Sequence, residues 1–315
     1  MKKGMLGKTG IEVSELCFGI LPMGPLQANL PVPEGAKLIR SAVEQDVNFL
    51  DTAEAYQTYP PIRAALEGWD KEIIIASKSA ADTYEKMEKA VYDALEALGR
   101  SYIDIFHLHA ARVEASVFEE RQGALQCLKD LRKKGLVRAV GISTHAVEAV
   151  ERAAQVDDID VVFPIINQTG LGIIGGSVTD MLSAIAKVHQ AGKGIYAMKA
   201  LGGGHLIGQL KSAFDFVRDI PGIASVAVGM VNAKELEVNL KLFNNVAPGD
   251  WLAVDHKINK KLLVASFCKG CGTCLDACPN QALSLHDGKA EVNHQLCLLC
   301  GYCNPVCPEF ALRLV

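Results

Sequence analysis

Short apolar runs alternate with longer amphipathic stretches through residues 16 to about 245 of this 315-residue chain. Eight of these runs are predicted to be strands: Leu16–Gly19, Asn48–Asp51, Ile73–Ala76, Ile103–Leu108, Val137–Ile142, Asp160–Pro164, Gly194–Met198 and Ala224–Val228. Most are nearly continuous in apolar residues, as expected of strands that are buried on both faces. The pattern therefore favours a parallel sheet covered by helices.

The stretches between these runs have the spacing of amphipathic helices. Glu85–Leu98 places its apolar residues on one side, and Gly99 is positioned to end that helix. A second helix is predicted over Phe118–Lys133 and ends before Gly135. Eight strand–helix units predict an α/β chain whose residues 1–254 form a (β/α)₈ TIM barrel, an architecture of about 250 residues.

Composition and charge exclude several classes of protein. Hydrophobic residues make up 50% of the chain and charged residues 22%, which argues against disorder. The formal net charge of −4 gives no reason to expect nucleic acid or an anionic membrane surface as a partner. We find no apolar run of transmembrane length and no apolar region of a secretory signal, so a cytoplasmic location is expected.

Eight of the ten cysteines lie between residues 268 and 307, in two sets with the spacing C-x₂-C-x₂-C-x₃-C-P. The sets are Cys268, Cys271, Cys274 and Cys278, and Cys297, Cys300, Cys303 and Cys307. This run resembles the signature of bacterial two-cluster ferredoxins, in which the fourth cysteine ligates the other cluster. The resemblance implies two [4Fe–4S] clusters, with Cys307 joining the first three cysteines and Cys278 joining the second three.

Residues 255–315 are accordingly predicted to form a small α+β dicluster ferredoxin-like domain. The expected elements are a connecting helix, a hairpin turning at Asp287-Gly288 and a final strand: His256–Leu263, Ala282–Leu285 with Ala290–Val292, and Phe310–Leu314. Two structural zinc sites are the alternative, although zinc is more often held by two separated CxxC pairs. The remaining cysteines, Cys17 and Cys127, are predicted to be small core residues.

Polar residues stand where several predicted barrel strands end, which is where TIM barrels carry their chemistry. Asp51 and Tyr56 follow the second strand, Lys78 the third and His109 the fourth. Asp51 can keep Lys78 charged, and a nearby ammonium lowers the pKa of a phenol. Tyr56 could then protonate a carbonyl oxygen that His109 also hydrogen-bonds, while hydride reaches the carbon. His107 is predicted to be structural and to face the opposite side of its strand from His109.

These residues resemble the motifs of the aldo/keto reductase superfamily. The matching motifs occur in order: Leu6-Gly7-Lys8-Thr9-Gly10, D-T-A-x-x-Y at 51–56, Ser77-Lys78, Leu108-His109, Gly141-Ile142-Ser143 and Asn167-Gln168. The chain most resembles the branch with a C-terminal 4Fe–4S ferredoxin-like domain. The resemblance implies that Tyr56 is the general acid and that Lys78 and Asp51 tune it. It also implies that His109 orients the substrate.

The same resemblance implies a nicotinamide cofactor, either NADP or NAD. Its candidate binding residues are Ser143, Thr144, Asn167, Gln168, Met198, Lys199, Gly202, Gly203, Gly204, Met230, Glu235 and Asn239. Thr144 stands where many members have Asn, and Met198 where many have an aromatic ring that stacks on the nicotinamide. Glu235 stands near the position of an Arg in NADP-preferring members. A carboxylate there would repel a 2′-phosphate and could accept from a ribose hydroxyl.

The leading hypothesis is an iron–sulfur oxidoreductase. Its barrel would reduce a small aldehyde or ketone, or oxidise the alcohol, with NADP or NAD. Its two clusters would carry out one-electron transfer, with a redox partner protein as a candidate partner. A hydride transfer moves two electrons, whereas each cluster moves one. How electrons would pass between the barrel and the ferredoxin-like domain is therefore a separate question. The alternative is an iron–sulfur electron carrier or redox sensor with a catalytically inactive barrel, which the departures at Met198 and Glu235 motivate.

Overall fold

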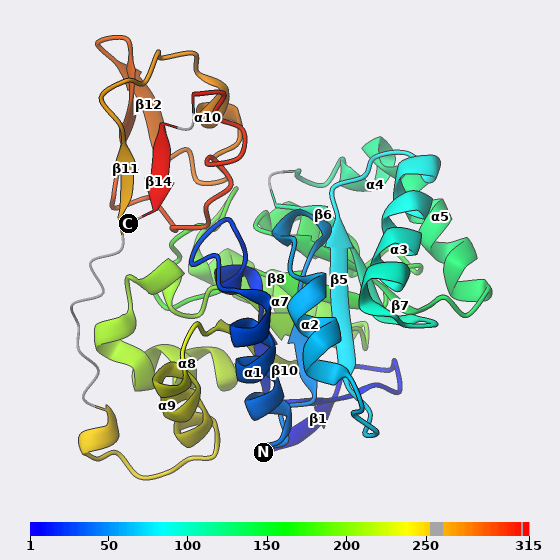
Figure 1. The fold of residues 1–315 in the computed structure, drawn as a ribbon. Coiled ribbons are helices and arrows are strands. Elements are labelled where there is room, and N and C mark those ends of the chain that lie inside the picture. Colours follow the sequence, from blue (N-terminus) through cyan, green and yellow to red (C-terminus); the bar gives the residue numbers. More distant parts are fainter. Residues whose placement is uncertain (112, 253–260, 310, 315) are drawn as a thin grey trace.

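Eight parallel strands close into a barrel, and a smaller unit follows at the C-terminal end of the chain (Figure 1). The computed structural model describes residues 1–111, 113–252, 261–309 and 311–314. Around the barrel the strands follow the order β10-β3-β4-β5-β6-β7-β8-β9, so β10 closes the ring on β3. The prediction of a TIM barrel is therefore confirmed.

The eight predicted barrel strands are all present, and four of them, β5, β6, β7 and β10, are longer than expected. Their bounds are β3 (Leu16–Gly19), β4 (Phe49–Asp51), β5 (Ile74–Ser79), β6 (Ile103–Ala110), β7 (Val137–Thr144), β8 (Val161–Pro164), β9 (Gly194–Ala197) and β10 (Ile223–Gly229). The strands β5, β6 and β7 continue into the polar residues that sequence analysis placed after them. In the sheet Lys78 pairs with His107, and His109 pairs with Ser143. The apolar sequence pattern ends where polar side chains begin at the barrel mouth. The backbone hydrogen bonds between neighbouring strands continue beyond that point.

Helices surround the barrel on its outer side (Figure 1). They are α1 (Val32–Val43), α2 (Tyr59–Leu66), α3 (Tyr84–Leu98), α4 (Val117–Glu120), α5 (Gln122–Lys133), α6 (Val147–Ala153), α7 (Val178–Gln190), α8 (Leu210–Arg218) and α9 (Ala233–Phe243). The prediction for α3 is confirmed: Thr83 caps its first turn, and Gly99 ends it with φ at 64°.

The prediction of one continuous helix over Phe118–Lys133 is wrong. The chain leaves helical geometry at Arg121, with φ at −115°, so that α4 and α5 are separate helices. At this break the Arg121 guanidinium donates a 2.8 Å hydrogen bond to the backbone oxygen of His109. A tertiary hydrogen bond thus ties the interruption to the end of β6.

An N-terminal hairpin, β1 (Lys3–Met5) with β2 (Glu12–Ser14), supplies apolar side chains to the barrel interior. Leu6, Ile11 and Val13 are fully buried there with Cys17. Cys127 lies instead in the larger core between the strands and the helices. Both cysteines outside the two sets are therefore buried core residues, as predicted.

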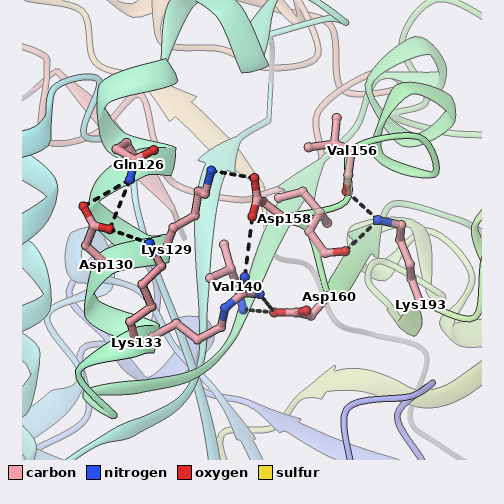
Figure 2. Close-up of polar contacts among 11 residues, drawn as sticks. Gln126, Lys129, Asp130, Lys133, Val140, Val156, Asp158, Asp160 and Lys193 are labelled. Carbon is pink, nitrogen blue, oxygen red and sulfur yellow. Dashed lines mark hydrogen bonds and ion pairs between the residues drawn. The ribbon is translucent and has the colours of Figure 1, made fainter.

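Polar contacts hold the segment before β8 and β9 at the N-terminal ends of the strands (Figure 2). Asp160 accepts a hydrogen bond of 2.8 Å from the backbone nitrogen of Val140 and one of 2.5 Å from Arg132. Lys193 donates to the backbone oxygens of Val156 and Ile159. This face, remote from the acid–base residues, contributes to stability.

Replacing Asp160 with alanine should lower the free energy of unfolding by about 1–3 kcal/mol, because the backbone donor of Val140 and the Arg132 guanidinium both lose a charged acceptor. Thermal or denaturant unfolding measures the change. The matched control is Asp157→Ala, an exposed aspartate in the same segment. An equal effect of the two substitutions would contradict the assigned role.

The described part of the C-terminal unit contains two small antiparallel pairs and one short helix. The pairs are β11 (Leu262–Val264) with β14 (Leu312–Leu314) and β12 (Leu283–His286) with β13 (Lys289–Val292), and the helix is α10 (Thr273–Asp276). The hairpin prediction is confirmed: Asp287 and Gly288 both have positive φ, at 47° and 71°, as a type I′ turn requires.

Two predictions about the connection between the units involve residues that are not described. Most of the predicted helix His256–Leu263 and the proposed domain boundary at 254/255 lie within residues 253–260, outside the described residues. The C-terminal end of that helix prediction is wrong, because Leu262–Val264 forms strand β11. Phe310, the first residue of the predicted final strand, is also outside the described residues, and β14 begins at Leu312. Over the ranges that are described, none of the helices combines the length and apolar character needed to cross a bilayer.

Candidate active site

Four polar side chains from three successive strands converge at one end of the barrel. Asp51 is the last residue of β4, and Tyr56 ends the 3₁₀ turn η2 (Glu54–Tyr56) that follows it. Lys78 lies on β5 and His109 on β6. The Lys78 ammonium is 2.7 and 2.9 Å from the two Asp51 carboxylate oxygens and donates a third bond, of 2.7 Å, to the backbone oxygen of Thr52.

The same ammonium lies over the Tyr56 ring, 4.9 Å from its centroid. The Tyr56 and His109 rings meet edge to face with centroids 6.1 Å apart. Both members of the Asp51–Lys78 pair are almost completely shielded from solvent, with side-chain exposures of 6% and 1%. Such a pair is held in a single arrangement, because separating either partner would leave a buried charge uncompensated.

Burial sets the protonation of the acid–base residues. It is the main cause that raises the pKa of the Tyr56 phenol, and Tyr302 and Asp51 add to it. The sequence predicted that Lys78 would lower the Tyr56 pKa, and the structure does not show this effect. The Lys78 ammonium lies over the face of the ring and is already paired with Asp51. Burial, followed by the positive charge of Lys78, lowers the pKa of His109 well below its usual value. At neutral pH the site therefore holds a protonated phenol and a neutral imidazole.

Tyr196 on β9 is a functional candidate that sequence analysis missed. Its hydroxyl donates a 2.9 Å hydrogen bond to Asp51, and its oxygen lies 2.8 Å from Nε2 of His107. A buried tyrosine inside an apolar strand needs a hydrogen-bond partner, which was the available signal. The expectation that His107 faces away from His109 is wrong, because residues two apart on a strand share a face. His107 lies in the barrel interior, where Gly141 leaves space for its ring.

A cavity of about 640 Å³ opens beside Asp51 and Tyr56, within the size range of small-molecule sites. Six of the predicted cofactor residues line it: Met198, Lys199, Gly203, Gly204, Glu235 and Asn239. The buried Asn239 Oδ1 has no hydrogen-bond partner among the residues that the structure describes. An unsatisfied acceptor in the cavity wall is what a ligand-binding surface provides. These residues fit a nicotinamide dinucleotide in size and polarity.

The other predicted cofactor residues lie outside the lining of this cavity. Ser143 and Thr144 end β7 in the buried mouth, where the Thr144 hydroxyl accepts from the backbone nitrogen of Ala146. Gln168 donates to Gln209 at 2.8 Å. Gly202 is a buried residue of the 3₁₀ turn η3 (Gly202–Gly204).

Asn167 and Met230 have other partners in the structure. The Asn167 side-chain oxygen accepts from Thr169 and Leu171, and its nitrogen donates to the backbone oxygen of Leu171. Met230 is fully buried in the core between strands and helices. Contact of either residue with a nucleotide stays a prediction.

The eight clustered cysteines gather into two groups. Cys268, Cys271, Cys274 and Cys307 line one small pocket. Around Cys303, burial first and then Cys300, Cys278 and Cys297 raise the pKa of its thiol, which places these four together. Each group therefore combines three cysteines of one set with the fourth of the other, the grouping that cross-ligation predicts.

The thiol groups fit clusters better than single ions. Among the described residues, no three His, Cys, Asp or Glu side chains are close enough together to hold one metal ion. Zinc requires its sulfur ligands at about 2.3 Å, whereas a four-iron cube separates its thiolates. Five of the cysteines also form much of the buried core of the unit, so cluster binding and folding are expected to be coupled.

A model of the aldo/keto reductase family matches residues 15–218. The chain belongs to this family. A model of the 4Fe–4S dicluster domain matches residues 267–311, so this family member carries an iron–sulfur domain at its C-terminal side.

The curated relatives that the chain matches are distant. The oxidoreductase YqkF of Bacillus subtilis is 25% identical over 159 residues, which are 46% of this chain and 49% of that protein. The aldo-keto reductase YhdN of the same organism is 24% identical over 180 residues, or 52% and 53% of the two chains. Methylglyoxal reductase DkgA of Escherichia coli is 27% identical over 136 residues, or 42% and 47%. The chain thus spans about half the length of the curated relatives it matches.

Solved structures show the same barrel. A protein from Pseudomonas aeruginosa described as an aldo-keto reductase superposes with a TM-score of 0.67 at 24% identity, over 77% of this chain and 94% of that one. The aldo-keto reductase AKR11C1 from Bacillus halodurans superposes with a TM-score of 0.66 at 18% identity, over 79% and 92% of the two chains. At these identities the likeness establishes the fold.

The iron–sulfur domain of this family member contacts the barrel mouth. Leu298 and Leu299, which lie between two cysteines of the second set, line the same cavity as Met198 and Lys199. His205, in the loop after β9, has its Nε2 2.9 Å from the backbone oxygen of Cys297. Sequence analysis could not find these contacts, because nothing in the local pattern relates residues 297–302 to the barrel.

His145, next to the predicted cofactor residue Thr144, is another buried group that sequence analysis did not assign. Burial, followed by the charge of Lys199, lowers the pKa of His145 to about 3. The folded protein therefore binds fewer protons than the unfolded chain below about pH 6.5, so stability is lost as pH falls through that range.

Between pH 7 and pH 5 this one residue should lower the free energy of unfolding by about 2 kcal/mol. The substitution His145→Gln should flatten the decline of thermal stability with falling pH. The exposed His189 provides the matched control, because His189→Gln should leave the slope unchanged. A slope that is the same in all three proteins would contradict the assignment.

Proposed function

We propose that this chain is an iron–sulfur oxidoreductase that reduces a small aldehyde or ketone, or oxidises the corresponding alcohol, with a nicotinamide cofactor. The observation that carries the proposal is the convergence of Asp51, Tyr56, Lys78 and His109 at one end of the barrel, where Asp51 and Tyr56 line the 640 Å³ cavity. The relative named methylglyoxal reductase supports a small carbonyl compound as the substrate class.

A nicotinamide cofactor held by cavity residues such as Lys199, Glu235 and Asn239 would supply hydride chemistry for the carbonyl carbon when bound. Tyr56 would donate its hydroxyl proton to the carbonyl oxygen and would be left as a phenolate, with the Lys78 ammonium over its ring. The neutral His109 imidazole hydrogen-bonds the same oxygen and orients it. The Tyr196 hydroxyl and Lys78 hold the Asp51 carboxylate from two sides, which keeps the ammonium in place.

The cysteine groups support two [4Fe–4S] clusters, which supply one-electron transfer. Cys268, Cys271, Cys274 and Cys307 would hold the first cluster, and Cys278, Cys297, Cys300 and Cys303 the second. The second group is adjacent to the cavity, because Leu298 and Leu299 form part of its wall. We infer that a redox partner protein exchanges electrons with this domain. Thiolate ligands persist in a reducing compartment, which supports a cytoplasmic location.

The residues that are predicted to hold the adenosine end of the cofactor favour NAD over NADP. The Glu235 carboxylate accepts hydrogen bonds from the backbone nitrogen of Val231 and from the Asn232 side chain, at 2.7 and 3.0 Å. These contacts place a negative charge at the N-terminus of α9, where a 2′-phosphate would otherwise find favourable donors. We therefore expect NADH to bind more tightly than NADPH.

The test uses the holo-protein, prepared without oxygen. Calorimetry measures binding of NADH and NADPH, and the loss of reduced-nucleotide absorbance measures turnover of a panel of small aldehydes and ketones. Binding with turnover would support the proposal. Iron-loaded protein that binds neither nucleotide would favour the alternative, an electron carrier or redox sensor with an inactive barrel.

A further inference from the structure

A side chain of the iron–sulfur domain reaches into the acid–base site of the barrel. The Tyr302 hydroxyl lies 3.3 Å from the Tyr56 hydroxyl and 3.3 Å from Nε2 of His109. The Tyr302 and His109 rings meet edge to face, with centroids 6.1 Å apart. Tyr302 therefore contacts both groups that the proposed reaction directs at the carbonyl oxygen.

The chain is shaped to bring Tyr302 to this position. Gly301 has φ at +80°, and a Cβ atom there would collide with the backbone oxygen of Leu26. The absence of a side chain thus lets the segment approach the loop that follows β3. Next to Gly301, Tyr302 packs against a small buried cluster formed by Leu26, Ala53 and Tyr56. Tyr302 is therefore held in this position by packing as well as by hydrogen bonds.

Hydrogen-bonding capacity makes Tyr302 a competitor of the substrate. A tyrosine hydroxyl has one proton to donate, and a neutral imidazole has one N–H. With Tyr302 in place, the Tyr56 hydroxyl and Nε2 of His109 each lie within hydrogen-bond distance of its hydroxyl. A carbonyl oxygen would need the same two partners and the same space between them.

We propose that Tyr302 occupies the position of the substrate oxygen, so that a carbonyl compound binds productively only when Tyr302 withdraws. The domain that carries the clusters would then control access to the catalytic end of the barrel. This inference rests on the proposed function for the identity of the ligand, but the occlusion of His109 is a property of the structure that can be measured separately.

The first measurement is the rate at which diethyl pyrocarbonate modifies His109, followed by mass spectrometry of the holo-protein without oxygen. Tyr302→Ala should raise this rate about tenfold, because an occluding contact worth one hydrogen bond is removed. The exposed His189 serves as the internal reference and should react equally in all variants. Equal reactivity of His109 and His189 in the unmodified protein would overturn the proposal.

The second measurement is steady-state kinetics of Tyr302→Phe, which keeps the ring and removes the hydroxyl. If Tyr302 competes with substrate, KM should fall about tenfold with kcat unchanged. A fall in kcat would instead make Tyr302 a required proton donor and overturn the proposal. The control is Tyr92→Phe on the exposed face of α3, and iron content verifies that each variant retains its clusters.

The two measurements separate failure of this inference from failure of the proposed function. If no protein turns over any carbonyl compound but Tyr302→Ala exposes His109, the occlusion stands and the carbonyl chemistry is wrong. If the unmodified protein turns over carbonyl compounds and Tyr302→Ala changes neither His109 reactivity nor KM, the carbonyl chemistry stands and the occlusion is wrong.

Discussion

Replacing Tyr56 with phenylalanine should lower kcat for carbonyl reduction by about 10²–10⁴-fold, because the substitution removes the proton donor and keeps the ring. Nucleotide affinity should be unchanged, since the hydroxyl faces the reacting oxygen. The Lys78 ammonium keeps its bonds to Asp51 and to the backbone oxygen of Thr52, so the barrel should remain folded. Steady-state kinetics, calorimetry and iron analysis measure the three properties.

Tyr92→Phe is the matched control for this substitution, because Tyr92 is 46% exposed on α3. It should leave every parameter unchanged. Turnover by Tyr56→Phe at the rate of the unmodified protein would remove Tyr56 from the role of general acid. The tetrad would then be a buried ion pair with two neighbouring rings, and the proposed reaction would lose its main support.

Replacing Cys278 with alanine should reduce the iron content from about eight to about four per chain, because one of two cubanes is lost. The structure groups Cys278 with the second set of cysteines, although it follows the first set in sequence. The double variant Cys278→Ala with Cys297→Ala should therefore retain about four irons, since both substitutions affect the same cluster.

The decisive comparison is Cys278→Ala combined with Cys268→Ala, which should lose nearly all iron. Sequential ligation would give the reverse pattern in the two double variants. Cys127→Ala is the control, because this thiol lies in the barrel core far from both sets in sequence and should leave the iron content unchanged. Iron analysis and visible absorption of protein prepared without oxygen measure the outcome.

Local sequence was sufficient for the presence of the eight barrel strands and for the hairpin at Asp287-Gly288. Buried parallel strands need continuous apolar runs, and a two-residue hairpin turn needs residues that tolerate positive φ. The break at Arg121 could not be predicted, since the amphipathic pattern continues through it. What interrupts the helix is a hydrogen bond to His109 on a different element.

The candidate site likewise has a part that the sequence could predict and a part that it could not. The tetrad could be placed at one rim because residues at the ends of parallel strands meet at the same face of a barrel. The competing uses of polar side chains could not be predicted. The Asn167 amide builds its own turn, and the Glu235 carboxylate caps α9, because each finds partners that depend on the folded backbone.

By itself the amino-acid sequence determined the barrel, the two cysteine sets and the placement of the four polar residues at one rim, because periodicity, ligand spacing and strand ends are local properties. Only the tertiary structure decided that Tyr302 lies between Tyr56 and His109, which are 246 and 193 residues away along the chain. That contact depends on how closely two separately patterned units approach at Gly301 and Leu26. Shape complementarity between distant surfaces has no periodic signature in the sequence, so it appears only when both surfaces are folded.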